Sequence, residues 1–248
     1  MSVLEFFLLI VAGFGGGLIG YITGMASIVT YPALLAVGLS PIAANVTNTV
    51  ALVSVGVGSV GQSGRILLDG DRRRLAKGGV AALIGGIVGA VILLVAPPDS
   101  FKATVPYLVV IASVALLAQP RLRDLASKHV DKPWIWYVGL GIISIYGGYF
   151  GAGAGIMMLA LALVFTSEPL WRATLSKSLF LGIANLVAAI GFAIFGPVHW
   201  MAAIAMTLGC LAGGWCGPPV VKRLPAGPLR IAVGIAGLGL AVWLGIRG

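Results

Sequence analysis

Residues 141–165 read GIISIYGGYFGAGAGIMMLALALVF, an apolar stretch in which glycines alternate with small residues at positions 151–155. The run that follows these glycines, residues 156–165, is about half of the roughly 20 residues that a helix needs to cross the hydrocarbon core of a bilayer. A second short run, residues 28–38, follows the stretch TGMAS at residues 23–27. The two places predict helices that are broken inside a membrane.

The composition of the whole chain also indicates a membrane protein. Of the 248 residues, 59% are hydrophobic and 9% are charged, whereas a soluble domain carries about 25% charged residues. So few polar residues cannot cover a water-soluble surface, which excludes soluble enzymes and disordered chains. The net charge of +9 comes from Lys and Arg between the apolar runs, which the positive-inside bias produces, so we expect no nucleic-acid partner.

The sequence indicates neither a removable signal peptide nor a metal or cofactor site. The segment before the first apolar run contains Glu5 and no Lys or Arg, whereas a secretory signal carries a cation there. We therefore expect this run to be retained as the first helix. Cys210 and Cys216 lie about 120° apart on a helical wheel, so we expect them to pack rather than to form a disulfide or bind a metal.

Ten apolar runs follow one another along the chain, eight of them long and two of them short. They cover residues 4–23, 28–38, 41–64, 75–96, 103–118, 134–150, 156–165, 169–195, 200–217 and 229–246. We therefore predict an all-α, polytopic transmembrane protein with eight full spans and two short helices. Its expected location is the inner (plasma) membrane, where it would be surrounded by the lipid bilayer.

The two breaks occupy equivalent places in an internal repeat. A shift of 128 residues, with a small gap for the last two pairs, aligns Gly13 with Gly141, Gly20 with Gly148, Tyr21 with Tyr149, Ile28 with Ile156, Leu35 with Leu163, Pro41 with Pro169, Gly85 with Gly209 and Gly89 with Gly213. The identities are few, but most fall on glycine and proline, where backbone geometry restricts the choice of residue. We predict two transmembrane repeats, residues 1–120 and 133–248, joined by a cytoplasmic linker at residues 121–132.

Whether the repeats are parallel or inverted depends on the short runs. If each short run continues the helix before it, each repeat crosses the membrane four times. The two sides of the membrane then hold ten and five cations, without Lys177, which lies inside a span. If each run turns the chain back, each repeat makes five passes, and one side holds only Lys102 and Arg247. The other side then holds thirteen cations: Arg65, Arg72, Arg73, Arg74, Lys77, Arg121, Arg123, Lys128, Lys132, Arg172, Lys222, Arg223 and Arg230. The positive-inside bias favours this second arrangement, with inverted repeats and both termini outside.

The breaks are candidate binding sites for an anion. Irregular backbone at membrane depth persists only where it is buried or lines a cavity, and helix N-termini attract anions through their free N–H groups. Transporters with inverted repeats bind substrates at such breaks. We expect a binding role for five break residues: Thr23, Gly24, Gly151, Gly153 and Gly155. The alternative is close helix packing, which we expect for glycines elsewhere: Gly85, Gly86 and Gly89.

Lys177 is the most informative side chain. It lies eight residues beyond Pro169, about 12 Å into a helix, where a cation is unfavourable and indicates function. It shares a helix face with Thr174, Ser178 and Asn185, and the matching position in the first repeat, Thr49, shares a face with Asn45 and Asn48. We expect Lys177 to supply charge to a pocket and four residues to supply hydrogen bonds: Asn48, Thr49, Thr174 and Ser178. The alternative is that Lys177 snorkels to the cytoplasmic interface.

The glycines of the two breaks form a spaced pattern, Gly13-x6-Gly20-Tyr21-x2-Gly24 and Gly141-x6-Gly148-Tyr149-x-Gly151-x-Gly153-x-Gly155. This pattern resembles the TauE/SafE family of sulfite and organosulfonate exporters, and the resemblance covers essentially the whole chain. It implies a membrane transporter that moves a sulfur oxyanion or a sulfonate. The chain departs from the family in the first break, where members often carry three glycines and this chain has Met25, Ala26 and Ser27.

Two other functions stay open at this point. Residues 61–64 read GQSG, which fits the Gly-x-Ser-Gly pattern of rhomboid intramembrane proteases, but a serine nucleophile needs a histidine base, and the chain has only His129 and His199. A membrane assembly protein without transport activity would leave Lys177 unexplained. No Asp or Glu lies deep in a span, so the carboxylates that usually carry protons through a membrane are missing. The membrane potential can drive export instead, because an anion that leaves a cell gains about 2.3 kcal/mol per charge per 100 mV. We therefore expect an exporter of a small anion and not an enzyme.

Overall fold

The computed structural model describes residues 1–63, 71–125, 133–166 and 168–221, together with residues 231, 235, 237–239 and 241–242. This part of the chain is all-helical, as the sequence predicted. The helices are α1 (Val3–Thr23), α2 (Ser27–Ala36), α3 (Pro41–Ser63), α5 (Arg72–Val95), α6 (Pro98–Leu125), α7 (Pro133–Tyr149), α8 (Ala154–Phe165), α9 (Leu170–Phe195) and α10 (Trp200–Val221).

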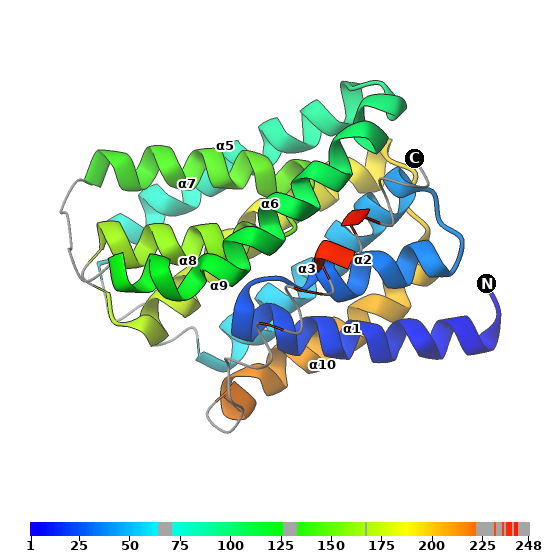
Figure 1. Cartoon of the computed structure of the whole chain (residues 1–248), viewed down its shortest axis with the longest axis horizontal. Coiled ribbons are helices and arrows are strands. Elements are labelled where there is room, and N and C mark those ends of the chain that lie inside the picture. The colour runs from blue at the N-terminus through cyan, green and yellow to red at the C-terminus, as the bar shows by residue number, and fades with distance from the viewer. Residues whose placement is uncertain are drawn as a thin grey trace.

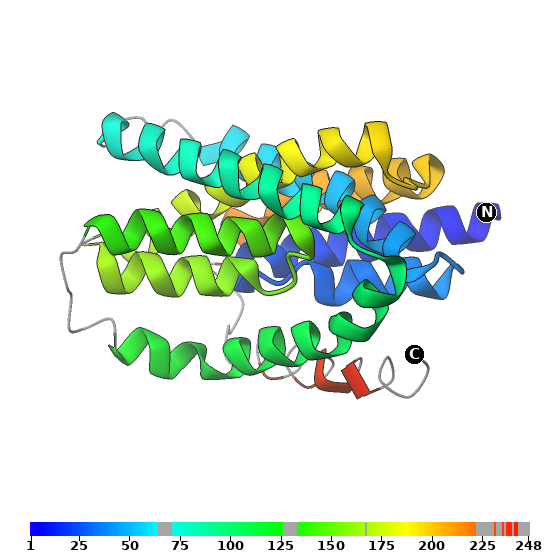
Figure 2. The same ribbon diagram turned by 90° about the horizontal axis from the view of Figure 1, so that it is seen from above.

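Both predicted breaks are present, and glycine makes them possible. Gly24 ends α1 with a φ of 82°, and its N–H donates a hydrogen bond to the carbonyl oxygen of Gly20 at 2.9 Å. Gly151 and Gly153, between α7 and α8, each have a φ of 78°. Side chains disfavour these left-handed conformations. The pairs α1–α2 and α7–α8 lie side by side, so each break turns the chain back on itself (Figures 1 and 2).

Five helices of the described chain are long and apolar enough to cross a membrane, namely α1, α3, α5, α9 and α10. The two short runs form α2 and α8, as their length predicted. α6 has 28 residues and α7 has 17, and neither belongs to this group. The last predicted span, residues 229–246, falls largely outside the described residues. The structure therefore supports a multi-pass membrane protein, and the number of eight full spans stays a prediction.

Helices from the first and second halves of the chain alternate in the packing. α1 packs against α10 and α7 against α5, while α3 contacts α10 and α9 contacts α5. In the predicted internal repeat α1 matches α7, α3 matches α9 and α5 matches α10, so these contacts form two exchanged pairs. The matched helices α3 and α9 also contact each other, so exchanging the two repeats leaves this contact unchanged. At this contact a Cβ atom on Gly56 would lie 2.9 Å from the Cα atom of Gly182. Such an exchange is what a two-fold relation between the repeats predicts.

Glycines let these helices approach one another backbone to backbone. A Cβ atom added to Gly85 of α5 would lie 2.6 Å from the carbonyl oxygen of Gly141 in α7. One added to Gly86 would lie 2.6 Å from the carbonyl oxygen of Ala184 in α9, and Gly89 likewise faces the backbone of α7. Small residues have this role in membrane helix pairs. These three α5 glycines therefore serve close helix packing, as the sequence predicted.

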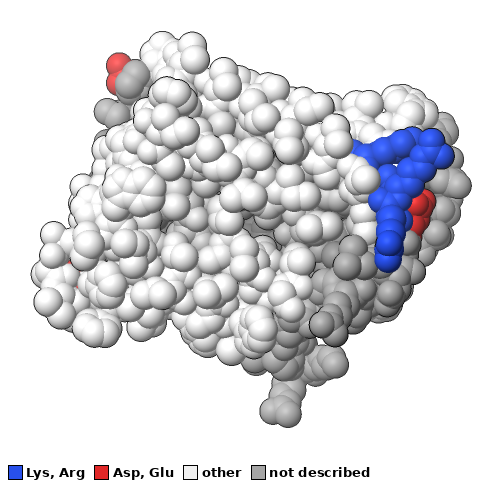
Figure 3. Space-filling view, turned by 180° about the vertical axis from the view of Figure 1, so that it is seen from behind, with Lys and Arg blue, Asp and Glu red and all other residues white. Residues whose placement is uncertain are grey.

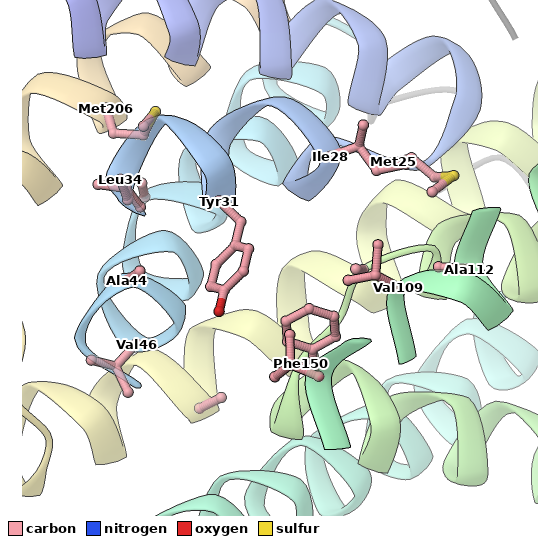
Figure 4. Packing of buried hydrophobic residues seen from close by; sticks show 14 of the residues in the cluster. Met25, Ile28, Tyr31, Leu34, Ala44, Val46, Val109, Ala112, Phe150 and Met206 are labelled. Carbon is pink, nitrogen blue, oxygen red and sulfur yellow. The ribbon is translucent and has the colours of Figure 1, made fainter. Parts of the chain in front are cut away.

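A cluster of buried apolar residues surrounds the two breaks. Met25, Ile28 and Tyr31 from the first hairpin lie near Phe150 of the second break and Ala112 of α6 (Figure 4). The rings of Tyr31 and Phe150 pack edge to face with their centroids 5.5 Å apart. This packing joins α2, which follows the first break, to the second break.

Basic side chains mark one end of the bundle. Arg72, Arg73, Arg74 and Lys77 lie in the first two turns of α5, where the side chain of Asp71 accepts a hydrogen bond from the N–H of Arg74 at 3.1 Å. Figure 3 shows one face of the molecule, on which the visible Lys and Arg side chains gather at a single end. This asymmetry has the form that the positive-inside bias produces.

Candidate functional site

A cavity of about 60 Å³ lies between the two breaks and the helices α3 and α9. Its polar side chains are Ser27, Thr49, Lys177, Ser178 and Asn185. Glycines of both breaks and of the α3–α9 contact complete the lining: Gly20, Gly24, Gly56, Gly151 and Gly182. None of the described residues that line this cavity is acidic. The cavity therefore combines one fixed cation with hydroxyl, amide and backbone groups.

Lys177 is buried at the first break, with 2% of its surface exposed. Its Nζ donates hydrogen bonds to the carbonyl oxygens of Tyr21 at 3.1 Å and of Gly20 at 3.4 Å, and it lies 6.0 Å from the centroid of the Tyr21 ring. These carbonyls belong to the last turn of α1, which carries partial negative charge that an ammonium stabilises. The side chain thus reaches from α9 to α1 and does not have the geometry of a snorkelling lysine.

At the second break, an amide binds the end of the broken helix as Lys177 does at the first. The Nδ2 of Asn45 in α3 donates to the carbonyl oxygen of Tyr149 at 2.8 Å, and Tyr149 is the repeat match of Tyr21. Each broken helix therefore has its last carbonyls bound by a side chain from the other half of the chain. The match of Lys177 is Thr49, whose hydroxyl donates within α3 to the carbonyl oxygen of Asn45 at 3.0 Å. The side chain bound to the last turn of α1 is charged, and the one bound to the last turn of α7 is neutral.

The two breaks touch each other through glycine backbone. A Cβ atom on Gly24 would lie 2.7 Å from the carbonyl carbon of Gly155, and one on Gly155 would lie 2.6 Å from the Cα atom of Gly24. No side chain fits between these two residues. At the breaks, the N–H groups of residues 24, 28–30, 150, 151, 154, 156 and 157 donate to backbone carbonyls, and within the described chain no such bond is made by the N–H of Ser27 or of Gly155. Helix N-termini with free N–H groups favour an anion nearby.

The structure brings five of the predicted site residues to the cavity: Gly24, Thr49, Gly151, Lys177 and Ser178. The other five lie around it. The Asn48 amide donates to the hydroxyl of Ser27 at 3.2 Å, and the Thr23 hydroxyl donates to a carbonyl of its own helix. Gly153 faces Ala112 of α6, whose Cβ atom is 2.7 Å from an added Cβ. The other two are Thr174, whose carbonyl accepts from Ser178, and Gly155 at the contact between the breaks.

Four polar groups at the site were not among the predicted site residues, and one of them is the Asn185 amide, which shares its helix face with Lys177. The carbonyl oxygens of Gly20 and Tyr21 bind Lys177, and Ser27 lines the cavity at the start of α2. A backbone carbonyl has no signal of its own in a sequence. The repeat match of Tyr21 with Tyr149 was the available signal, because it places the ends of the two broken helices at equivalent positions.

A second cavity, of about 230 Å³, lies at the start of α5 and α9. Two of its charged groups have partners within the protein: the Glu168 carboxylate accepts from Ser176 at 3.1 Å, and the Arg74 guanidinium lies 5.5 Å from the Trp136 ring centroid. Both acidic and basic residues line it, and it does not include the breaks. The cavity between the breaks is therefore the better candidate for an anion.

The family model for the sulfite exporter TauE/SafE matches residues 9–244, nearly the whole chain. The chain belongs to the TauE/SafE family. A relative from Sinorhizobium sp, "Probable membrane transporter protein ORF9", is 27% identical over 238 residues, which cover 95% of this chain and 90% of the relative. "Probable membrane transporter protein YfcA" of Escherichia coli (strain K12) is 25% identical, over 87% of this chain and 79% of its own. No solved structure matches the chain.

Membership of the TauE/SafE family identifies the chain as a membrane transporter and not an enzyme. A third relative, "Probable membrane transporter protein YunE" of Bacillus subtilis (strain 168), is 23% identical over 89% of this chain and 90% of its own length. The names of these relatives give no support to the protease alternative. Its candidate nucleophile, Ser63, is the last residue of α3, and its side chain lies outside the described part of the chain.

Proposed function

We propose that this TauE/SafE protein exports a small anion, sulfite or an organosulfonate, across the inner membrane and binds it in the cavity between the breaks. The observation that carries this proposal is the buried ammonium of Lys177 in a cavity whose described lining is free of carboxylates. An ammonium has three N–H donors, and two of them point to the carbonyls of Gly20 and Tyr21. The third can bind an oxyanion.

Neutral groups around Lys177 can supply the remaining hydrogen bonds. The Asn185 amide lines the cavity and carries two N–H donors. The hydroxyls of Thr49 and Ser178 donate to carbonyls of their own helices, and each can rotate toward an anion. Three sulfite or sulfonate oxygens match a set of several donors around one charge. The family description supports a sulfur oxyanion as the substrate class.

An anion panel tests the substrate. We expect vesicles that contain the purified protein to move labelled sulfite or a sulfonate, and an imposed potential of 100 mV to shift the equilibrium ratio by about 50-fold per transported charge. Labelled sulfate, chloride and a neutral sugar serve as comparisons in the same vesicles. Movement of the neutral solute alone would contradict an anion site. An absence of flux for every solute would favour the assembly-protein alternative.

We propose further that the repeats, residues 1–120 and 133–248, are inverted, with eight full spans and both termini outside. Three observations support this arrangement. Each break turns the chain back (Figures 1 and 2), helix contacts of the two halves form exchanged pairs, and basic side chains gather at one end (Figure 3). The proposed cytoplasmic linker, residues 121–132, lies only in part within the described residues, which include the end of α6.

Reporter fusions test this topology. We expect reporters placed after Gly248 and within residues 99–102 to lie on the outer face, and reporters within residues 70–74 and 121–128 to lie in the cytoplasm. The physical reason is the division of cations, thirteen against two, that five passes per repeat produce. Paired reporters that are active on opposite sides of the membrane give the measurement. A cytoplasmic C-terminus would contradict inverted repeats and favour two parallel repeats of four crossings.

A further inference from the structure

Three buried oxygen atoms beside the two breaks have no hydrogen-bond partner among the described residues. They are the hydroxyl oxygen of Tyr31 and the amide oxygens of Asn45 and Asn48. Each of these side chains is at most 1% exposed. A buried polar atom without a partner is strongly unfavourable, so native proteins rarely keep one without a reason. Three in one region indicate that this region binds something.

Contacts of the amide nitrogens place Asn45 beside the second break and Asn48 beside the first. Asn45 and Asn48 are three residues apart in α3, so they lie on one face of the helix. Their Nδ2 atoms are both engaged, on the carbonyl oxygen of Tyr149 at 2.8 Å and on the hydroxyl of Ser27 at 3.2 Å. The nitrogen of each amide is therefore held by the start of α2 or the end of α7. The oxygen of each amide is the end that is free to accept.

Tyr31 brings the third oxygen to the same region. It lies four residues after Ser27 in α2, on the same helix face, and its ring packs against Phe150, which follows Tyr149 directly. Figure 4 shows the Tyr31 ring extending from α2 between the start of α3 and Phe150. The three oxygens thus come from α2 and α3, where the start of α2 lies near the end of α7.

The end of α1 has a positive charge beside it that the end of α7 lacks. The last turn of α1 receives the ammonium of Lys177 on the carbonyl oxygen of Tyr21. The last turn of α7 has the same partial negative charge, but its Tyr149 carbonyl receives only the neutral amide of Asn45, and Thr49 stands where the repeat places Lys177. One broken helix end therefore has a positive charge beside it, and the equivalent end has neutral acceptor oxygens.

We propose that a sodium ion binds at the second break, held by the oxygens of Tyr31, Asn45 and Asn48, in the role that the Lys177 ammonium has at the first. Oxygen ligands suit a hard cation, and the C-terminal ends of broken helices coordinate sodium in other transporters. Neutral ligands favour a single charge, because calcium and magnesium sites use carboxylates. None of the three oxygens gains a proton at neutral pH, so a proton is not the ligand.

The sodium ion would act on the anion cavity as a counter-charge. Ser27 and Phe150 line that cavity and also contact the side chains of the ion site, through Asn48 and Tyr31. An anion and a cation held this close attract each other, and by linkage each raises the affinity for the other by the same factor. This consequence rests on the proposed anion site, whereas the binding of sodium does not.

Equilibrium binding of ²²Na⁺ to the purified full chain tests the proposal. Sodium is exchanged for N-methyl-D-glucamine at constant ionic strength, and we expect saturable binding of one ion per chain. Tyr31→Phe keeps the ring contact with Phe150 and removes only the hydroxyl, so it should fold and weaken binding about tenfold or more. Asn48→Ala should weaken it similarly. Ser144→Ala is the matched control, because it removes another buried, unpartnered oxygen, on α7, and should bind sodium like the wild type.

The outcomes separate this proposal from the function on which it builds. A lack of saturable ²²Na⁺ binding would overturn the sodium site. This is the result expected if water, and not an ion, fills the site. Wild-type affinity in both Tyr31→Phe and Asn48→Ala would overturn it as well. Thermal unfolding in sodium-free buffer confirms that each variant is folded. Anion flux and affinity that are the same with and without sodium would contradict the counter-charge role, whereas the ²²Na⁺ measurement alone decides the ion site.

Discussion

Lys177→Met is expected to abolish anion flux while the protein still inserts into the membrane. Methionine is similarly long and apolar, but it removes the one fixed charge of the described cavity and both hydrogen bonds to the end of α1. An ion pair at 4 Å and an effective dielectric constant of about 20 contributes roughly 4 kcal/mol before desolvation. If a third of this survives, the affinity for the anion falls about tenfold. Flux and anion binding in vesicles, at matched protein levels, give the measurement.

Lys177→Gln separates the two roles of this residue. Glutamine keeps an N–H donor for the carbonyls of Gly20 and Tyr21 but carries no charge. If charge is what the anion requires, this variant should fold like the wild type and transport as poorly as Lys177→Met. Wild-type flux in Lys177→Gln would instead show that the lysine only caps α1. Lys177→Arg keeps the charge and should retain flux with an altered preference among anions, because a planar guanidinium binds oxyanions differently from an ammonium.

Gly155→Val is expected to stop transport and to destabilise the protein. Its Cβ atom would lie 2.6 Å from the Cα atom and 2.7 Å from the carbonyl oxygen of Gly24, and backbone atoms cannot move aside as a flexible side chain can. Overpacking of this kind costs about 1–3 kcal/mol. The substitution would also separate the two breaks that line the cavity. Thermal unfolding and flux per folded molecule give the two measurements.

Gly15→Val is the matched control, because an added Cβ at this α1 glycine has nothing within 4 Å. We expect its unfolding temperature and flux to stay close to the wild-type values, since surface substitutions usually change stability by no more than about 0.5 kcal/mol. Gly155→Ala, with a smaller side chain, should fall between wild type and Gly155→Val. Equal losses in Gly155→Val and Gly15→Val would contradict a special role for the contact between the breaks.

Local sequence features predicted the helices and the breaks well. Apolar runs of known length placed α1, α3, α5, α9 and α10, and the two short runs became α2 and α8. The glycines at the breaks were predictable because a left-handed backbone at Gly24, Gly151 and Gly153 disfavours any side chain. Helical periodicity also grouped Thr49 with Asn45 and Asn48, and Lys177 with Ser178, on faces that reach the region between the breaks.

The partners of these side chains could not be predicted from the sequence. Lys177 binds the carbonyl oxygens of Gly20 and Tyr21, which precede it by more than 150 positions. Asn45 binds the carbonyl oxygen of Tyr149, which follows it by 104 positions. Every residue except proline has the same N–H and C=O groups, so sequence patterns do not distinguish one carbonyl from another. Gly153 shows the same limit, because its place in the glycine pattern indicated a cavity residue and its backbone instead faces Ala112 of α6.

By itself the sequence determined that this chain is an all-helical membrane protein with two glycine-broken helices and one lysine deep among apolar residues. These features follow from side-chain hydrophobicity and backbone conformation, which are properties of each residue and its near neighbours. Only the tertiary structure decided that Lys177 lies at the end of α1, that Gly24 touches Gly155 and that the Asn45 amide binds the carbonyl oxygen of Tyr149. Each of these depends on how helices from the two halves of the chain pack, and packing brings together groups that are far apart in the sequence.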